Sequence, residues 1–215
     1  MPCGWEEMKP MFLNMGDGMM KRGNFVKVPI TFNIKELQKA TNELFTKMSW
    51  KSHIVKGLCM TQIPGDPSSA DGDKLRGLFW TKPDSTGKEV QRENDVDESH
   101  YTEFVKEFKG TYFEYVHKYL SAKYKLGRFR LLLLEPRTSL SWHRDPEPRL
   151  HIPIMTNPGA HLVIDDTLKH LPADGGVWFT DTRNYHTVFN GGEENRIHLV
   201  ATYLGEKDPL MRAGM

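Results

Sequence analysis

The chain has 215 residues, of which 38% are hydrophobic and 27% charged, and its formal net charge is +1. This balance is ordinary for a globular protein, and a net charge near zero gives no general attraction to nucleic acid or to an anionic membrane, so we expect neither partner. Two distant cysteines form neither a disulfide framework nor a CxxC motif, and no stretch approaches the roughly 20 apolar residues of a membrane helix. We expect a cytoplasmic protein with one domain spanning residues 1–215.

The part before the predicted strand core, residues 1–125, carries the helical patterns. Asn33 with Glu36 three residues later is typical of a capping box at a helix start. Apolar residues at helical spacing follow this box: Leu37, Leu44, Phe45 and Met48. A second pattern predicts a longer helix over Tyr101–Leu120, with a kink at Gly110. We interpret its aromatic stripe as core that covers a sheet.

The segment between the two helical patterns gives weaker signals. His53–Met60 is a candidate strand. The following residues, 62–98, are rich in Gly, Pro, Ser and Asp, with one apolar island at Leu78–Trp80. A loop this long in a compact domain is usually functional or disordered, and two readings stay open: a mobile insertion, or a lid over a substrate.

Short strands dominate the remainder, residues 126–205. The candidate strands are Arg128–Glu135, Leu140–Asp145, Leu150–Thr156, His161–Asp165, Gly176–Asp181, Tyr185–Asn190 and Arg196–Tyr203. Turn signals such as Asn157-Pro158-Gly159 separate them. Seven short, closely spaced strands favour a barrel or a two-sheet jelly roll over a parallel sheet. The fold class predicted is therefore mainly β with some α, a jelly-roll core with the N-terminal helices packed against it.

A metal-ligating pattern lies within this strand-rich part. His143 and Asp145 are separated by one residue, so in a strand both side chains point to the same face. His186 follows some forty residues later. Two imidazoles and one carboxylate are the ligands of the facial triad that holds non-haem Fe(II) and leaves an open side. We therefore predict that His143, Asp145 and His186 are both the metal ligands and the catalytic centre.

An arginine follows the distal histidine by ten residues. The planar fork of Arg196 can take a carboxylate through two parallel hydrogen bonds. Together with an open iron, an anchor for a dicarboxylate indicates that 2-oxoglutarate and O2 are the cosubstrates. Apolar residues flank Arg196 and His198, so the last strand should be buried on both faces, where a charge needs a partner or a ligand.

Two other histidines compete for the role of distal ligand. His161 and His170 also lie in the strand-rich part, but neither has an arginine ten residues later. A lone buried histidine is most often a hydrogen-bonded core residue. We therefore interpret both as structural.

At this point a resemblance can be stated. The segments that carry it are Arg149–Ile154, Asn157–Gly159, Gly176–Asp181, His186–Asn190 and Glu194–Val200. Together they resemble the aspartyl/asparaginyl β-hydroxylase family of the 2-oxoglutarate- and Fe(II)-dependent oxygenases. The resemblance covers roughly Phe129 to Leu204.

The resemblance implies a double-stranded β-helix, or cupin-like, fold. It implies that His143 and His186 are metal ligands and that Arg196 pairs with the distal carboxylate of 2-oxoglutarate. It also implies that Arg149 and His151 lie near the other end of this cosubstrate. Some members, including the vertebrate aspartyl hydroxylase, lack the carboxylate ligand. Asp145 is present in this chain, so we expect a full triad.

The resulting expectation is an iron dioxygenase that hydroxylates an unactivated C–H bond of an amino-acid side chain, free or within a peptide, with release of succinate and CO2. The alternative is a metal cupin that is non-catalytic or independent of 2-oxoglutarate and acts as a binding or sensor module. Candidates to line the substrate side are Arg183, Trp142 and Trp178.

Overall fold

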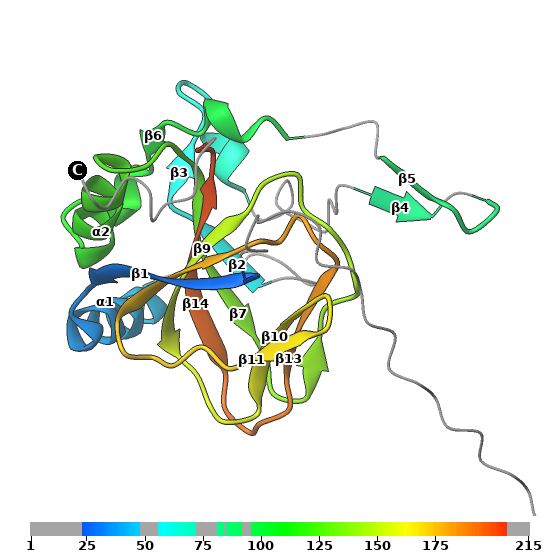
Figure 1. Ribbon diagram of the computed structural model, residues 1–215. Helices are drawn as coiled ribbons and strands as arrows, with labels where there is room; N and C mark the ends of the chain where they lie inside the picture. The colour runs from blue at the N-terminus through cyan, green and yellow to red at the C-terminus, as the bar shows by residue number, and fades with distance from the viewer. Residues whose placement is uncertain (1–22, 48–55, 72–80, 84, 92–95, 206–215) are drawn as a thin grey trace, which may run out of the picture.

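A computed structural model describes residues 23–47, 56–71, 81–83, 85–91 and 96–205, and it is built around two antiparallel sheets (Figure 1). In spatial order, the six-stranded sheet contains β1 (Phe25–Thr31), β12 (Gly176–Thr180), β9 (Arg149–Met155), β14 (Arg196–Tyr203), β7 (Leu126–Leu134) and β2 (Lys56–Cys59). The four-stranded sheet contains β11 (Thr167–Lys169), β10 (Ala160–Ile164), β13 (His186–Asn190) and β8 (Thr138–Ser139). Two facing antiparallel sheets form the jelly-roll core that the sequence predicted.

The three central strands of the large sheet have two different faces. One face of β7 carries Phe129, Leu131 and Leu133, which belong to the main hydrophobic core. The same alternation on β9 and β14 sends Ile152 and Leu199 to this core. The opposite face of the three strands carries polar and charged side chains together with Leu132 and Leu134, and these line a pocket. The large sheet therefore separates an apolar layer from the candidate site.

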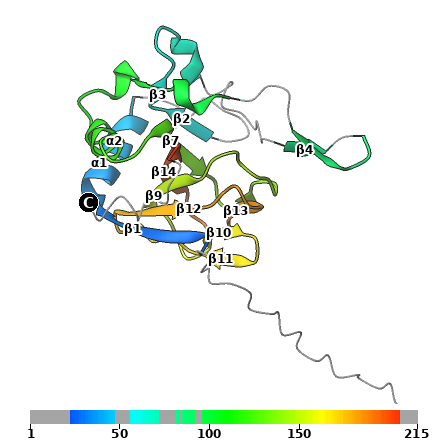
Figure 2. The ribbon, with the colours of Figure 1, turned by 45° about the horizontal axis from the view of Figure 1, so that its top comes forward.

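Two helices cover the apolar face, where the main core lies. They are α1 (Ile34–Phe45), which contacts β9, and α2 (Tyr112–Ser121), which contacts β7 (Figures 1 and 2). The first helix confirms the pattern behind Asn33, whose side chain accepts hydrogen bonds from the backbone N–H groups of Lys35 and Glu36.

The second helix is shorter than predicted. Its start is set by Gly110, which has φ +78° and so cannot continue a right-handed helix. The prediction of a kinked helix over Tyr101–Leu120 is therefore wrong in its first half. That half contains β6 (Glu103–Phe104) and the 3-10 turn η3 (Lys106–Phe108) instead, and another 3-10 turn, η2 (Glu98–His100), precedes it.

Most of the predicted strands are confirmed, but the structure also differs from the prediction. The core is not confined to residues 126–205, because β1 and β2 join the large sheet from the N-terminal part. The unpredicted β1 contains Pro29, which a strand tolerates at a sheet edge, and the register of β1 shifts between Val28 and Thr31. Leu140–Asp145 is not a strand: in this region only Thr138–Ser139 forms one, and His143 makes an isolated bridge.

The expected long loop, residues 62–98, contains short elements in its described parts. These are β3 (Thr61–Gln62), η1 (Pro67–Ala70), β4 (Thr81–Pro83) and β5 (Glu89–Gln91). The β4–β5 hairpin projects away from the side that carries the helices (Figure 1). The apolar island Leu78–Trp80 lies outside the described residues. Within the described chain, no helix is long and apolar enough to cross a membrane.

Candidate metal centre

Two histidines from distant parts of the chain are joined by their backbones. The N–H of His143 donates to the carbonyl of His186 at 3.0 Å, and the N–H of His186 donates back at 2.9 Å. This reciprocal pair is an antiparallel bridge, which places the two imidazole rings 4.1 Å apart between centroids. This bridge to the first residue of β13 therefore holds the two rings together, although His143 is not part of a regular strand.

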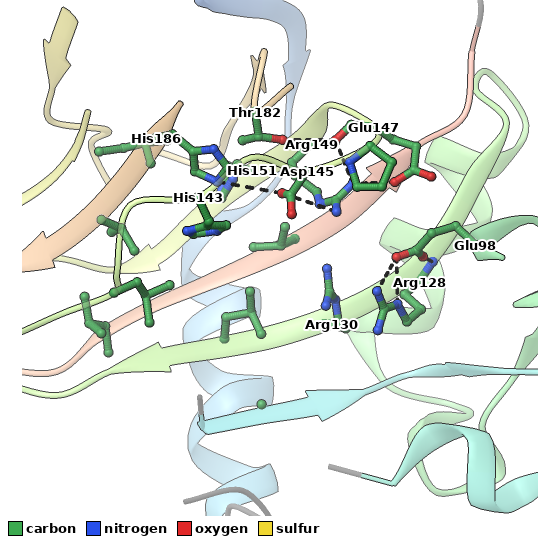
Figure 3. A pocket seen from close by; sticks show the side chains of 18 of the residues that line it. Glu98, Arg128, Arg130, His143, Asp145, Glu147, Arg149, His151, Thr182 and His186 are labelled. Atoms are coloured by element: carbon green, nitrogen blue, oxygen red, sulfur yellow. Dashed lines mark hydrogen bonds and ion pairs between the residues drawn. The ribbon is translucent and has the colours of Figure 1, made fainter. Parts of the chain in front are cut away.

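Asp145 joins the two imidazoles through a separate backbone contact. Its N–H donates to the carbonyl of Thr182 at 2.9 Å. This places its Oδ2 at 3.7 Å from Nε2 of His186 (Figure 3). The candidate ligand atoms of His143, Asp145 and His186 all lie within 4.8 Å of one another. A cluster of this size can close on one metal ion with little movement of the side chains.

The hydrogen bonds of the two imidazoles fix which ring nitrogen is available. Nδ1 of His143 donates to the carbonyl of Ser141 at 2.7 Å, and Nδ1 of His186 donates to that of Asn184 at 3.0 Å. Since a carbonyl only accepts, both Nδ1 atoms carry the proton and both Nε2 atoms keep a lone pair. Burial lowers the pKa of His143 and lowers that of His186 to about 4, so both rings are neutral at pH 7. Neutral rings with a lone pair on Nε2 are in the form that binds a metal.

A buried arginine, Arg149, orients the carboxylate of the cluster. Burial opposes the ionisation of Asp145, but Arg149 and the imidazoles outweigh it and lower the pKa of this carboxyl. Nη2 of Arg149 lies 3.2 Å from Oδ2 of Asp145, and its Nη1 donates to the carbonyl of Glu147 at 2.8 Å. Asp145 is therefore an anion held in place beside two neutral imidazoles.

The competing histidines lie apart from this cluster. His161 and His170 pack against each other with ring centroids 5.9 Å apart, and Nδ1 of His170 contacts the carbonyl of Ala160. In the described chain, only the set of His143, Asp145 and His186 could hold a metal ion. The structure thus places neither competitor where it could replace His186.

The cluster opens into a pocket between the two sheets, and Arg196 lies in the wall of this pocket. Its side chain is buried, and burial lowers the pKa of its guanidinium to about 9. Nη2 donates to Nδ1 of His198 at 2.9 Å, and no carboxylate of the described residues contacts it. A buried cation without an anionic partner is costly, so the site is suited to receive an anion.

Two buried histidines, His198 and His151, extend the contacts of Arg196 across the large sheet. Nδ1 of His198 accepts from Arg196 and lies 3.3 Å from Nδ1 of His151. Burial and the charge of Arg196 hold the pKa of both histidines well below 6.5. His151 is therefore a neutral ring in the pocket wall.

The other end of the pocket contains a buried ion pair that sequence reasoning missed. Glu98 accepts from Nε of Arg128 at 2.7 Å and from the backbone N–H of the same residue at 2.8 Å (Figure 3). Gly127 permits this approach, because a Cβ there would lie 2.7 Å from the Cβ of Glu98. One available signal was the pair Arg128 and Arg130 at i, i+2 in an otherwise apolar strand. Nothing local pointed to Glu98, thirty residues earlier.

The three candidates for the substrate side lie elsewhere. Arg183 is exposed and forms a two-pronged ion pair with Asp181, both contacts being 2.7 Å. Trp142 is also exposed, at 56%. Trp178 packs against a second, smaller apolar cluster, and Lys27 and Lys169 lie over its ring. This cluster consists of Leu134, Leu162, Ile164, Leu171 and Val188. None of the three belongs to the pocket lining.

The Glu98–Arg128 pair should make the folded state sensitive to acid. The two arginines near Glu98 outweigh its burial and lower the pKa of its carboxyl to about 2, against an ordinary value of 4.5. A lowered pKa stabilises the fold above about pH 4.5, and this stabilisation is lost as the pH falls toward 2. We expect Glu98→Gln to reduce the free energy of unfolding by about 3 kcal/mol at pH 7.

Urea unfolding of wild type and variant between pH 7 and pH 4 measures this difference, which should shrink below about pH 4.5. Glu193→Gln is the matched control, because Glu193 forms an ion pair with Arg137 that is exposed to solvent. We expect a much smaller change there. A Glu98→Gln difference that grows on acidification would contradict the assignment.

No curated protein matches this chain. Similar solved structures include a 2OG-Fe(II) oxygenase family oxidoreductase from Burkholderia pseudomallei, with 14% identity, coverage of 84% of this chain and 85% of that chain, and TM-score 0.46. Another is the viral collagen prolyl hydroxylase of Paramecium bursaria Chlorella virus-1 in its 2OG complex, with 12% identity, coverage of 86% and 99%, and TM-score 0.44. AviO1 from Streptomyces viridochromogenes has 17% identity, coverage of 86% and 91%, and TM-score 0.42.

One family model also matches the chain. It describes the aspartyl/asparaginyl beta-hydroxylases and aligns with residues 96–204, just over half of the sequence. The aligned segment contains the metal-ligating cluster, both ends of the pocket and all three central strands of the large sheet. The chain therefore belongs to the aspartyl/asparaginyl β-hydroxylase family.

Proposed function

We propose that this protein is a 2-oxoglutarate- and Fe(II)-dependent dioxygenase that hydroxylates an unactivated C–H bond of an amino-acid side chain, free or within a peptide. The reaction consumes one O2 and one 2-oxoglutarate, and it yields succinate, CO2 and the hydroxylated product. The observation that carries this proposal is the donor set of two neutral imidazoles and one carboxylate, opening into a pocket with a buried arginine that no carboxylate of the described residues contacts.

The residues present fit an iron ion. Nε2 of His143, Nε2 of His186 and a carboxylate oxygen of Asp145 would hold it, and the set of two nitrogens and one oxygen is the one found in non-haem iron oxygenases. When bound, the iron would supply the activation of O2. Arg149 would keep the Asp145 carboxylate aligned, as groups behind the metal ligands commonly do.

The cosubstrate would be held by cations of the pocket wall. Arg196 would take the distal carboxylate of 2-oxoglutarate, in place of its present contact with His198. Arg149 and His151 would lie near the opposite end of the cosubstrate, beside the metal ligands. The aliphatic side chains of Leu134, Leu162 and Val188 would exclude water from the space between these groups.

The test is a pair of measurements on the full chain. Under anaerobic conditions, Fe(II) with 2-oxoglutarate should give a weak charge-transfer band in the visible region, because bidentate chelation of the metal produces one. In air, the loaded protein should convert 2-oxoglutarate to succinate, and the correct amino acid or peptide should stimulate this conversion. Metal binding without the band or succinate would instead support the alternative of a metal cupin that does not use 2-oxoglutarate.

A further inference from the structure

Each of the two segments that carry the candidate metal ligands also has a side chain outside the pocket. Arg144 lies between His143 and Asp145 in the sequence. Tyr185 directly precedes His186. The three candidate ligands line the pocket, whereas neither Arg144 nor Tyr185 belongs to its lining. Instead, the guanidinium of Arg144 lies over the ring of Tyr185, 5.1 Å from its centroid. The two segments therefore meet outside the pocket as well as at their backbone bridge.

A carboxylate from a distant part of the chain, Glu89, binds both of these outer side chains. Nε of Arg144 donates to Oε1 of Glu89 at 3.3 Å, and Nη2 donates to Oε2 at 3.0 Å. The hydroxyl of Tyr185 also donates to Oε2. Exposed ion pairs usually contribute little, but a guanidinium that meets both carboxylate oxygens within a network is an exception. Glu89, Arg144 and Tyr185 thus form an outer clip across the two ligand-bearing segments.

Glu89 also anchors a hairpin to the body of the protein. It is the first residue of β5, and in the described chain β4 and β5 form a separate two-stranded sheet (Figure 1). A two-stranded hairpin is at best marginally stable without a further packing partner, so its position depends on its anchors. Because Arg144 and Tyr185 are sequence neighbours of the candidate ligands, the hairpin and the metal centre share the same two backbone segments.

We propose that Glu89 is a positioning residue of the metal centre, which holds the two ligand-bearing segments together and links metal binding to the docking of the β4–β5 hairpin. This inference rests on the metal-binding part of the proposed function. Glu89 joins the two segments outside the pocket, and a metal ion would join them inside it. Ligands that are already held in position lose less conformational freedom when the metal binds.

The coupling between the hairpin and the metal acts in both directions. If the docked hairpin strengthens metal binding by some factor, bound metal favours docking by the same factor. Loss of a group that contacts a metal ligand directly lowers metal affinity by about 10- to 100-fold. Glu89 acts through neighbours of the ligands, and its side chain is 28% exposed, so we expect a smaller factor of about three to ten.

The first measurement is the affinity of the full chain for Fe(II), by isothermal titration under anaerobic conditions without 2-oxoglutarate. Glu89→Gln removes the charge of the clip and keeps the size of the side chain. It should weaken Fe(II) binding about three- to tenfold, as the coupling requires. Glu135→Gln is the matched control, because Glu135 forms a partly exposed ion pair with Lys56 outside the pocket lining. This control should keep the wild-type affinity.

The second measurement is the docking of the hairpin, followed as the rate of tryptic cleavage after Lys88, the residue before Glu89. Cleavage requires the undocked hairpin, so Fe(II) should slow it about three- to tenfold in wild type. In Glu89→Gln, Fe(II) should have little effect on this cut. Cleavage after Lys109, an exposed residue in the turn before α2, is the internal reference and should not respond to the metal. A glutamate that only stabilises the fold would not make the cut at Lys88 depend on Fe(II).

The outcomes separate this inference from the proposed function. Weaker Fe(II) binding by Glu89→Gln, together with protection of Lys88 by Fe(II) in wild type, supports the inference. A wild-type protein that binds Fe(II) without protection of Lys88 overturns the inference and leaves the proposed function intact, and this result needs no variant. Unchanged Fe(II) affinity in a folded Glu89→Gln variant, checked by circular dichroism, also overturns it. A wild-type protein that binds no Fe(II) overturns the proposed function and the inference with it.

Discussion

His186→Ala should abolish both the binding of Fe(II) and the production of succinate. The side chain supplies one of three donor groups that lie within 4.8 Å of one another, and its Nδ1 is already committed to the carbonyl of Asn184. No other histidine of the described chain can take its place in this set. Iron retained after anaerobic gel filtration and succinate formed in air are the two measurements.

The matched control is His170→Ala, which removes an imidazole of the same strand-rich region that lies outside the cluster. It should retain iron and turnover. The backbone bridge between His186 and His143 does not need the imidazole side chain, so the sheets should stay intact in the variant. Circular dichroism of both variants checks this. Full succinate production by His186→Ala would remove His186 from the ligand set.

The side chains of a strand that share one face could be predicted, because strand alternation is a local property. In β14, every residue is buried, as the apolar residues beside Arg196 and His198 indicated. The same alternation in β9 places Arg149 and His151 on the pocket face. Such an alternation can be predicted from the sequence alone, because neighbouring side chains of a strand always point to opposite faces.

Features that depend on contacts between distant segments could not be predicted. The pattern of His143 and Asp145 suggested a strand, but a backbone bridge to His186 and a bond to Thr182 bring the two side chains together instead. Pro29 argues locally against a strand, although an edge position tolerates it. Both outcomes are set by pairing partners far away in the sequence.

The end of the pocket that contains the Glu98–Arg128 pair also depends on contacts between distant segments. Arg128 and Arg130 occupy equivalent positions in β7, and the sequence does not distinguish them. Glu98 makes the difference, because it pairs with Arg128, whereas Nε of Arg130 has no partner among the described residues. The partner comes from a 3-10 turn at the end of the segment that was expected to be a long loop. Which arginine is available to a ligand therefore follows only from the three-dimensional arrangement.

Arg196→Met should weaken the binding of 2-oxoglutarate by about 30- to 900-fold, which corresponds to the roughly 2–4 kcal/mol of a buried, charge-assisted pair. The variant keeps the apolar stem of the side chain and removes its charge. Iron binding should persist, because Arg196 contacts His198 and none of the three candidate ligands. Titration of the anaerobic visible band with 2-oxoglutarate measures the affinity directly.

The same variant should be at least as stable as wild type without ligand. Burial alone lowers the pKa of Arg196, and no described carboxylate offsets the cost of its charge, so replacing it with an apolar chain removes a penalty. A structural arginine behaves in the opposite way, since its loss lowers the melting temperature. Arg128→Met provides that comparison, because it leaves Glu98 buried without its partner. If Arg196→Met lost stability while keeping its affinity for 2-oxoglutarate, Arg196 would be a structural residue. Lower affinity with undiminished stability identifies it as a cation kept in the core for its ligand.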